Sequence, residues 1–165
     1  MDIVSKEVRS RMMAGIRGSD TSPEIKVRRM LHRYGFRYRL HQRNLPGRPD
    51  LVLSRYRVCI FVHGCFWHRH AGCRYATTPR TNDEFWRIKF DQNVARDAEN
   101  KKSLLASGWR VFELWECGIR GPETEMNWIL DAIRDCNQKF VSWPDLITGT
   151  ASEIRRSAEP DRNDA

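Results

Sequence analysis

The chain has 165 residues, 40% of them hydrophobic, and a formal net charge of +8. A chain of this length folds as one domain whose core needs no disulfide bonds, and its longest apolar run, residues 58–62, is far too short to cross a membrane. The composition therefore excludes a membrane protein, and the excess of Arg and Lys makes nucleic acid the first partner to consider, although many unrelated proteins are also basic.

The N-terminal residues lack both the apolar stretch and the cleavage site of a secretory signal. We therefore expect a cytoplasmic protein whose thiols stay reduced. Residues 1–20 form a basic, amphipathic segment, because Lys and Arg are interspersed with Val, Met and Ile. We expect this segment to contact DNA, as a short helix.

The next segment has the signals of a helix. Ser22 is the expected N-cap, Pro23 suits the first helical position, and Glu24 is the acidic residue of the first turn. Gly35 ends the helix. Its apolar residues recur at helical spacing: Val27, Met30, Leu31 and Tyr34.

Three predicted strands follow. Residues 36–40 alternate apolar and basic side chains, which predicts a half-exposed strand. After the turn-rich loop 45–49, the runs 50–53 and 56–62 are close enough to form an antiparallel hairpin. The second run is almost continuously apolar, so we expect it to be buried on both faces at the centre of the sheet.

The C-terminal half completes an α/β pattern. A long charged helix is predicted from residue 82 or 83 to 107, a strand over 109–115 and a last helix over 122–138. The order predicts a central sheet flanked by helices, within a domain spanning residues 21–147. Residues 148–165 contain few apolar side chains, so we expect a disordered tail.

Residues 63–73 contain two cysteines and three of the five histidines of the chain. In a reducing compartment such clustering predicts a tetrahedral zinc site, for which a free buried thiol cluster is the alternative. Cys65 and Cys73 are the local thiolates, and Cys117, just after the strand 109–115, is a distant third. The fourth ligand is one of the local histidines, and spacing does not select it.

Other cysteines and aromatic residues divide between the core and a binding surface. Cys59, in a buried strand, and Cys136, on the predicted last helix, are expected to pack as small apolar side chains. Phe85 is also expected to pack in the core. Phe66 and Trp67 lie inside the proposed metal loop, where burial is hard to arrange, so we expect them to wedge between bases.

A carboxylate next to this loop suggests phosphodiester hydrolysis. That reaction needs a water, a base that activates it, and positive charge on the phosphoryl oxygens. Asp50 begins a strand beside a basic loop and is suited to hold Mg²⁺, although a Pro-Asp pair is also an ordinary turn signal. A histidine not needed for zinc is suited to act as the base.

Four separated motifs, within residues 5–140, resemble the bacterial very-short-patch repair endonucleases. They are LPGRPD at 45–50, HGCFWH at 63–68 with His70 and Cys73, FW at 85–86, and WEC at 115–117. The resemblance implies a restriction-endonuclease-like core with a mixed sheet. It also implies a Mg²⁺-dependent enzyme that cuts 5′ to the thymine of a T:G mismatch, which arises when 5-methylcytosine deaminates, and so starts very short patch repair. The implied partner is double-stranded DNA bound by a monomer, with other repair proteins possible by family analogy.

The resemblance also implies roles for individual residues. Asp50 and the main-chain carbonyl of Val62 would hold Mg²⁺. His68 would be the general base, supported by Glu24 through metal-bound water, and His63 a second catalytic imidazole. The structural Zn²⁺ would be held by Cys65, His70, Cys73 and Cys117. The DNA-contacting residues would be Phe66, Trp67 and Trp86 in an aromatic wedge and Met13 in the minor groove.

The sequence departs from the family in three places. Phe61-Val62-His63 replaces the acidic-x-Lys pair usual in this nuclease fold, Val62 replaces a hydroxyl residue, and one extra residue separates Cys65 from Cys73. Two other hypotheses therefore stay open. One is a restriction-type or structure-specific nuclease of the same fold, and the other is a non-catalytic, zinc-stabilised DNA-binding module.

Overall fold

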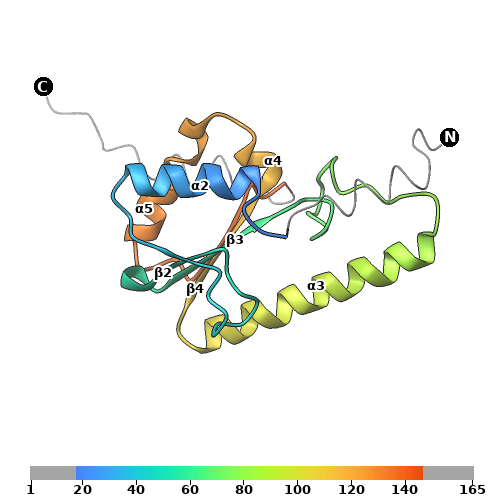
Figure 1. Ribbon diagram of the computed structural model, residues 1–165, viewed down its shortest axis with the longest axis horizontal. Helices are drawn as coiled ribbons and strands as arrows, with labels where there is room; N and C mark the ends of the chain where they lie inside the picture. Colours follow the sequence, from blue (N-terminus) through green and yellow to red (C-terminus); the bar gives the residue numbers. More distant parts are fainter. Residues whose placement is uncertain (1–17, 147–165) are drawn as a thin grey trace, which may run out of the picture.

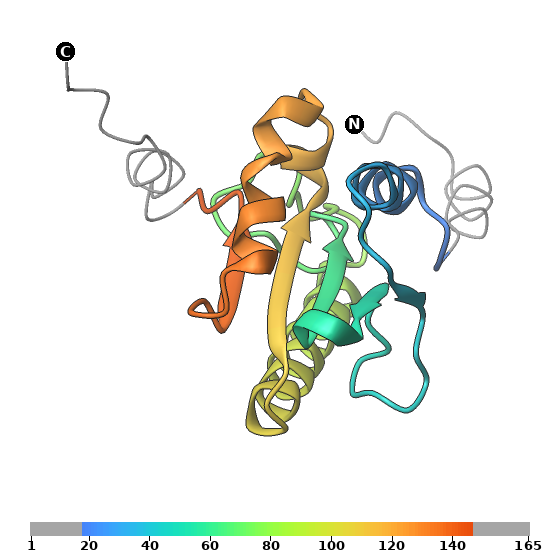
Figure 2. The same cartoon turned by 90° about the vertical axis from the view of Figure 1, so that its left-hand side faces the viewer.

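The structure, a computed structural model, describes residues 18–146. Its centre is a five-stranded mixed sheet in the order β1-β2-β3-β4-β5. The first three strands pair antiparallel, and β4 and β5 continue the sheet in parallel, as Figure 2 shows for β3 and β4. The strands are β1 (Arg39–Leu40), β2 (Leu51–Leu53), β3 (Val58–His63), β4 (Arg110–Trp115) and β5 (Phe140–Trp143).

Helices cover both faces of this sheet (Figure 1). On one face lie α2 (Ser22–Arg33) and α5 (Trp128–Arg134), and on the other lies α3 (Asp83–Ala106), whose N-terminal half extends beyond the sheet. Two short elements, α4 (Glu116–Ile119) and the 3₁₀ turn η2 (Glu123–Met126), follow β4, and a second 3₁₀ turn, η1 (Ser54–Tyr56), joins β2 to β3. The mixed α/β architecture with helix-flanked sheet is therefore confirmed.

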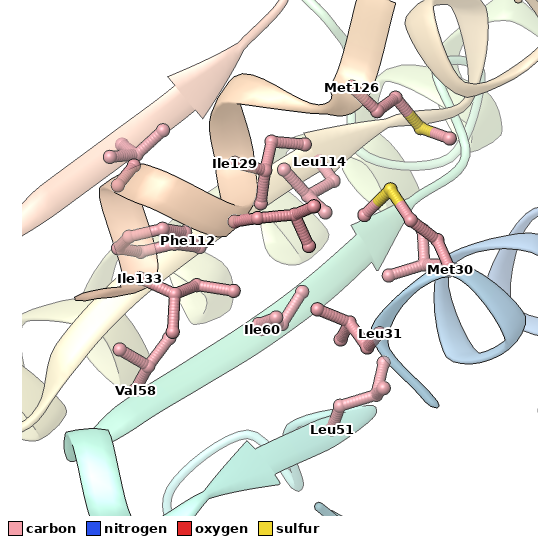
Figure 3. Packing of buried hydrophobic residues seen from close by; sticks show 14 of the residues in the cluster. Met30, Leu31, Leu51, Val58, Ile60, Phe112, Leu114, Met126, Ile129 and Ile133 are labelled. Atoms are coloured by element: carbon pink, nitrogen blue, oxygen red, sulfur yellow. The ribbon is translucent and has the colours of Figure 1, made fainter. Parts of the chain in front are cut away.

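The larger core lies between the sheet and the α2–α5 layer (Figure 3). Met30 and Leu31 of α2 and Ile129 of α5 meet Ile60 and Phe112 of the central strands, and all five side chains are fully buried. Successive residues of a strand point to opposite faces of the sheet. Cys59 and the side chains beside it on the adjacent strands therefore pack against α3. The two middle strands are thus covered on both sides, as the continuous apolar run of residues 58–62 predicts.

Several predicted elements are confirmed, with altered ends. The β2–β3 hairpin forms, and the long helix ends before Gly108, which adopts a left-handed φ of +77°. The predicted N-cap Ser22 is wrong, because Thr21 is the cap and its hydroxyl accepts from the Glu24 amide at 3.4 Å. The strand predicted over 36–40 shrinks to Arg39–Leu40, since only these two residues pair with β2.

The C-terminal predictions need correction. The helix expected over 122–138 is divided into η2 and α5 and ends at Arg134, and the unpredicted β5 then joins the edge of the sheet beside β4. Cys136 therefore follows the helix and is exposed, so its expected burial is wrong. Phe85 is 59% exposed, because the adjacent Trp86 occupies the side of α3 that packs against Phe66, and its expected core packing is wrong as well.

Some expectations lie outside the described residues. These include the basic segment up to residue 17, with Met13, and the expected tail 148–165. Between residues 18 and 146, the helices are too short or too polar to cross a membrane.

Candidate metal centre and nuclease site

The predicted zinc ligands meet in one place. One ligand atom each from Cys65, His70, Cys73 and Cys117 lies within 4.8 Å of all the others. The Nδ1 atom of His70 is 3.3 Å from Sγ of Cys117 and 3.7 Å from Sγ of Cys65. The three thiols come from two segments that are distant in sequence, the 65–73 loop and α4. A set of three sulfurs and one imidazole has the chemistry of a closed structural zinc site.

His70 is oriented for this role. Its Nε2 atom donates a hydrogen bond to the carbonyl oxygen of Pro144 at 2.9 Å, which leaves Nδ1 free to bind a metal. Its ring stacks on Trp115, with centroids 4.2 Å apart and planes 6° apart. Burial raises the pKa of the Cys65 and Cys117 thiols and lowers that of His70. A zinc ion would reverse the effect on the thiols by binding them as thiolates, so these residues fit zinc.

A second cluster contains the other two histidines of the loop region. His63 ends β3, His68 lies five residues later, and Asp97 projects from α3. Nδ1 of His68 is 2.5 Å from Oδ2 of Asp97, and the two imidazole centroids are 4.1 Å apart. Although burial opposes ionisation, the hydrogen bond and charge of His68 hold the pKa of Asp97 below its usual value. A charged Asp97 therefore fixes the His68 ring and leaves its Nε2 atom available to a substrate.

His63 differs chemically from its neighbour. It is only 6% exposed, and burial lowers its pKa to about 3, with a contribution from the charge of His68. At neutral pH it is therefore a neutral imidazole, which can accept a hydrogen bond or bind a cation. It does not bring positive charge to a phosphate.

Asp50 is fixed by the neighbouring strand. Its Oδ2 atom accepts a hydrogen bond from the amide of Val62 at 2.7 Å. Burial raises the pKa of Asp50 to about 6, the amide hydrogen bond opposes this rise, and the charges of Glu24 and His68 act on it in opposite directions. A partly buried carboxylate whose ionised form is disfavoured fits a hard cation such as Mg²⁺, which would stabilise its charge.

Glu24 is held at the start of α2. It is 3% exposed, and its carboxylate accepts hydrogen bonds from the amide of Asp20 at 3.0 Å and from the hydroxyl of Thr21 at 3.0 Å. Nη2 of Arg28 is 2.9 Å from the same carboxylate. The structure therefore places Glu24 beside the Asp50 region and also gives it a role in capping the helix.

A cavity of about 300 Å³ lies between α3 and the ends of β3, β4 and β5 and is bordered by the second cluster. Within it, Nζ of Lys101 is 3.1 Å from Oε1 of Glu113, which is 8% exposed. Burial raises the pKa of Glu113, and Lys101 opposes this rise. The sequence offers no motif for Asp97, Lys101 or Glu113. They are single charged residues in a charged helix and an apolar strand, and only the packing of α3 on β4 brings them to the histidines.

The aromatic residues expected to contact DNA form a cluster near the N-terminal half of α3. The ring of Phe66 lies 5.1 Å from Trp67, 5.8 Å from Trp86 and 5.1 Å from Phe90, measured between centroids. Phe66 and Trp67 are half-buried, whereas Trp86 is 8% exposed. The exposed Phe85 packs edge-on against Trp86. The three predicted wedge residues are thus in one cluster, and Phe85 is the more accessible member of its pair.

Comparison with known proteins identifies relatives of this chain. The profile of the family described as DNA mismatch endonuclease Vsr matches residues 1–74. The Type II nicking enzyme V.XorIIP of Xanthomonas oryzae is 45% identical over 118 residues, which cover 72% of this chain and 86% of the relative. DNA mismatch endonuclease Vsr of Escherichia coli is 43% identical over 122 residues, which cover 74% and 78% of the two chains. The Type II nicking enzyme V.NmeAIP of Neisseria meningitidis is 40% identical over 119 residues, covering 72% and 84%.

Proposed function

This chain belongs to the DNA mismatch endonuclease Vsr family of DNA-cleaving enzymes, and we propose that it nicks one strand 5′ to the thymine of a T:G mismatch. Such mismatches arise when 5-methylcytosine deaminates, so the nick would start very short patch repair. The observation that carries the proposal is the imidazole of His68, which Asp97 orients just after β3, the strand whose Val62 amide holds the carboxylate of Asp50.

Each residue of the site has a distinct chemical role in this proposal. Asp50 and the main-chain carbonyl of Val62 hold Mg²⁺, which supplies positive charge to the scissile phosphate when it is bound. His68 takes the proton of the attacking water through Nε2, while Asp97 fixes its ring and stabilises the imidazolium that forms. The neutral His63 accepts a hydrogen bond near the phosphate, and Glu24 supports the water network from the α2 side.

The zinc cluster has a structural role in the same proposal. Zn²⁺ held by Cys65, His70, Cys73 and Cys117 would tie the loop that carries His68 to the end of β4. The resulting restriction-endonuclease-like core keeps the base in place without disulfide bonds. The bacterial origin of the relatives supports a cytoplasmic location, where bacterial DNA lies and thiols stay reduced.

DNA recognition would use the aromatic cluster and the basic N-terminal segment. Phe66, Trp67 and Trp86 would wedge beside the mismatch, and Met13 would press from the minor groove. The half-buried state of Phe66 and Trp67 supports this role, because these rings have exposed surface to offer a base. We propose that the enzyme acts on double-stranded DNA as a monomer, with contacts to other repair proteins.

Nicking assays test this function. Zinc-loaded protein with Mg²⁺ is incubated with duplexes that carry a T:G mismatch in varied flanking sequences, and with matched T:A duplexes as the control. We expect one cut 5′ to the mismatched thymine and no cut in the matched duplex. Cleavage of both strands of matched DNA would instead identify a restriction-type nuclease, and inactivity on every T:G duplex would overturn the proposal.

A further inference from the structure

We propose that His41 is a positioning residue that fixes the carboxylate of Asp50. The sequence gives no sign of this role, because His41 stands between a two-residue strand and a turn-rich loop. The inference rests on the proposed function, since it concerns the orientation of the carboxylate that would hold the divalent cation.

The imidazole of His41 lies between two carboxylates. Its Nδ1 atom is 3.8 Å from Oδ1 of Asp50, and its Nε2 atom is 3.9 Å from Oε2 of Glu24. The other oxygen of Asp50, Oδ2, already accepts the amide hydrogen bond of Val62 at 2.7 Å. His41 therefore faces the carboxylate oxygen that the backbone leaves unfixed.

A neighbouring arginine determines which nitrogen of His41 carries the proton. Nη2 of Arg28 is 3.1 Å from Nε2 of His41, and the same guanidinium is anchored 2.6 Å from Asp20 and 2.9 Å from Glu24. A guanidinium only donates hydrogen bonds, so Nε2 must accept. The proton of the neutral ring is then on Nδ1, which is directed at Asp50, and a small movement would give a hydrogen bond.

The backbone of His41 also points to a fixed orientation. Its φ is +45°, in the left-handed region that residues other than glycine rarely adopt. Its amide donates to the main-chain carbonyl of Asp50 at 3.3 Å, directly after the β1–β2 pairing. Unfavourable backbone conformations of this kind persist where the surrounding structure enforces them, and they are frequent at functional sites.

This arrangement has a consequence for metal binding. A partner that orients a ligating carboxylate typically contributes about 10–100-fold to metal affinity. Loss of the Nδ1 donor should therefore weaken cation binding at Asp50, whereas a residue that only fills space in the loop would leave it unchanged.

The test measures Mn²⁺ binding by titration calorimetry with zinc-loaded, full-length protein and no DNA. We expect His41→Ala to raise the Kd for Mn²⁺ by about 10-fold or more. His41→Asn should stay within about threefold of the wild type, because its amide donates from the position of Nδ1 and Asn tolerates a left-handed φ. His32→Ala, which changes an exposed histidine on α2, is the matched control.

Two further measurements separate the possible results. Thermal unfolding identifies any variant that binds weakly because it folds poorly, and Asp50→Ala should abolish the binding. If Asp50→Ala abolishes binding and His41→Ala leaves the Kd unchanged, the role of His41 is overturned while the proposed cation site stands. If Asp50→Ala binds Mn²⁺ like the wild type, the cation site itself is wrong and the role of His41 falls with it.

Discussion

The two candidate sites contain the same residue type but different partners. In the zinc cluster, His70 faces three thiols and donates its other nitrogen to a main-chain carbonyl. In the nuclease cluster, formed by His63, His68 and Asp97, His68 pairs with the carboxylate of Asp97 and lies beside the ring of His63. All three histidines lie within eight residues of sequence, so in the proposed function one loop would serve two chemistries. The neighbours of an imidazole, rather than its place in a motif, decide whether it is suited to bind a metal or to move a proton.

The largest expected effect comes from breaking the zinc cluster. Cys117→Ser should reduce zinc content below one ion per chain, lower the thermal stability and abolish nicking, because the loop that carries His68 loses its attachment to α4. Metal analysis and thermal unfolding measure the first two effects. Cys136→Ser, which changes an exposed cysteine, is the control. A Cys117→Ser protein with full zinc content would show that this thiol is not a ligand.

Breaking the nuclease cluster should slow nicking without changing zinc content or DNA affinity. Asp97→Asn should slow single-turnover nicking by about 100-fold, because an amide orients His68 less well and does not stabilise its protonated form. Zinc content and DNA affinity should stay at the wild-type level. Asp91→Asn, at an exposed position on the same helix, is the matched control. Equal rates for Asp97→Asn and the wild type would remove Asp97 from the site.

The ion pair between the partly exposed Lys101 and the buried Glu113 should have a smaller effect, mainly on stability. Lys101→Met leaves Glu113 buried without its cation, so we expect the free energy of unfolding to fall by about 1–3 kcal/mol at neutral pH. The double change Lys101→Met with Glu113→Leu should recover most of this loss, because the uncompensated charge is gone. Urea unfolding measures both variants, and a double variant no better than the single one would contradict this explanation.

The smallest effect concerns the pH dependence of stability. The pKa of Asp50 is about 6 in the folded protein against 3.8 for an unperturbed aspartate, so the folded state holds the proton more tightly. The stability from this group is complete below about pH 4 and is lost as the pH rises through 6. Asp50→Asn removes this dependence, so its stability relative to the wild type should increase by about 1 kcal/mol between pH 5 and 7.5 in magnesium-free buffer. A pH-independent difference would contradict the burial of an uncompensated charge.

The zinc cluster was more predictable from sequence than the nuclease cluster. Cys65 and Cys73 lie close together in sequence, and Cys117 follows a strong strand signal, so residue chemistry alone identified the three thiols, whereas only the family resemblance singled out His70. Asp97, by contrast, is brought to its site by the packing of α3, and His41 is placed by its left-handed backbone conformation. Neither feature leaves a local pattern in the sequence. Residues whose role depends on tertiary contacts carry little local signal.

In the fold, too, elements with a strong local sequence signal were predictable and elements that depend on tertiary contacts were not. The β2–β3 hairpin and the central position of β3 were predictable, because their apolar runs are long relative to the turn between them. The edge strand β5 was missed, because four residues with Ser142 in the third position depend on β4 to form a strand. The difference in burial between Phe85 and Trp86 was also missed. Which of two adjacent aromatics is buried depends on the rotation of α3 relative to Phe66.

The central claim is that Asp50 and His68 act on the same phosphate. A double-mutant cycle tests it most directly, with single-turnover nicking of a T:G duplex by Asp50→Ala, His68→Ala and the double variant, all zinc-loaded. Residues that act as one catalytic unit are strongly non-additive, so we expect the double variant to be about as slow as the slower single variant. If the two losses multiply instead, the two side chains act independently and the account is contradicted.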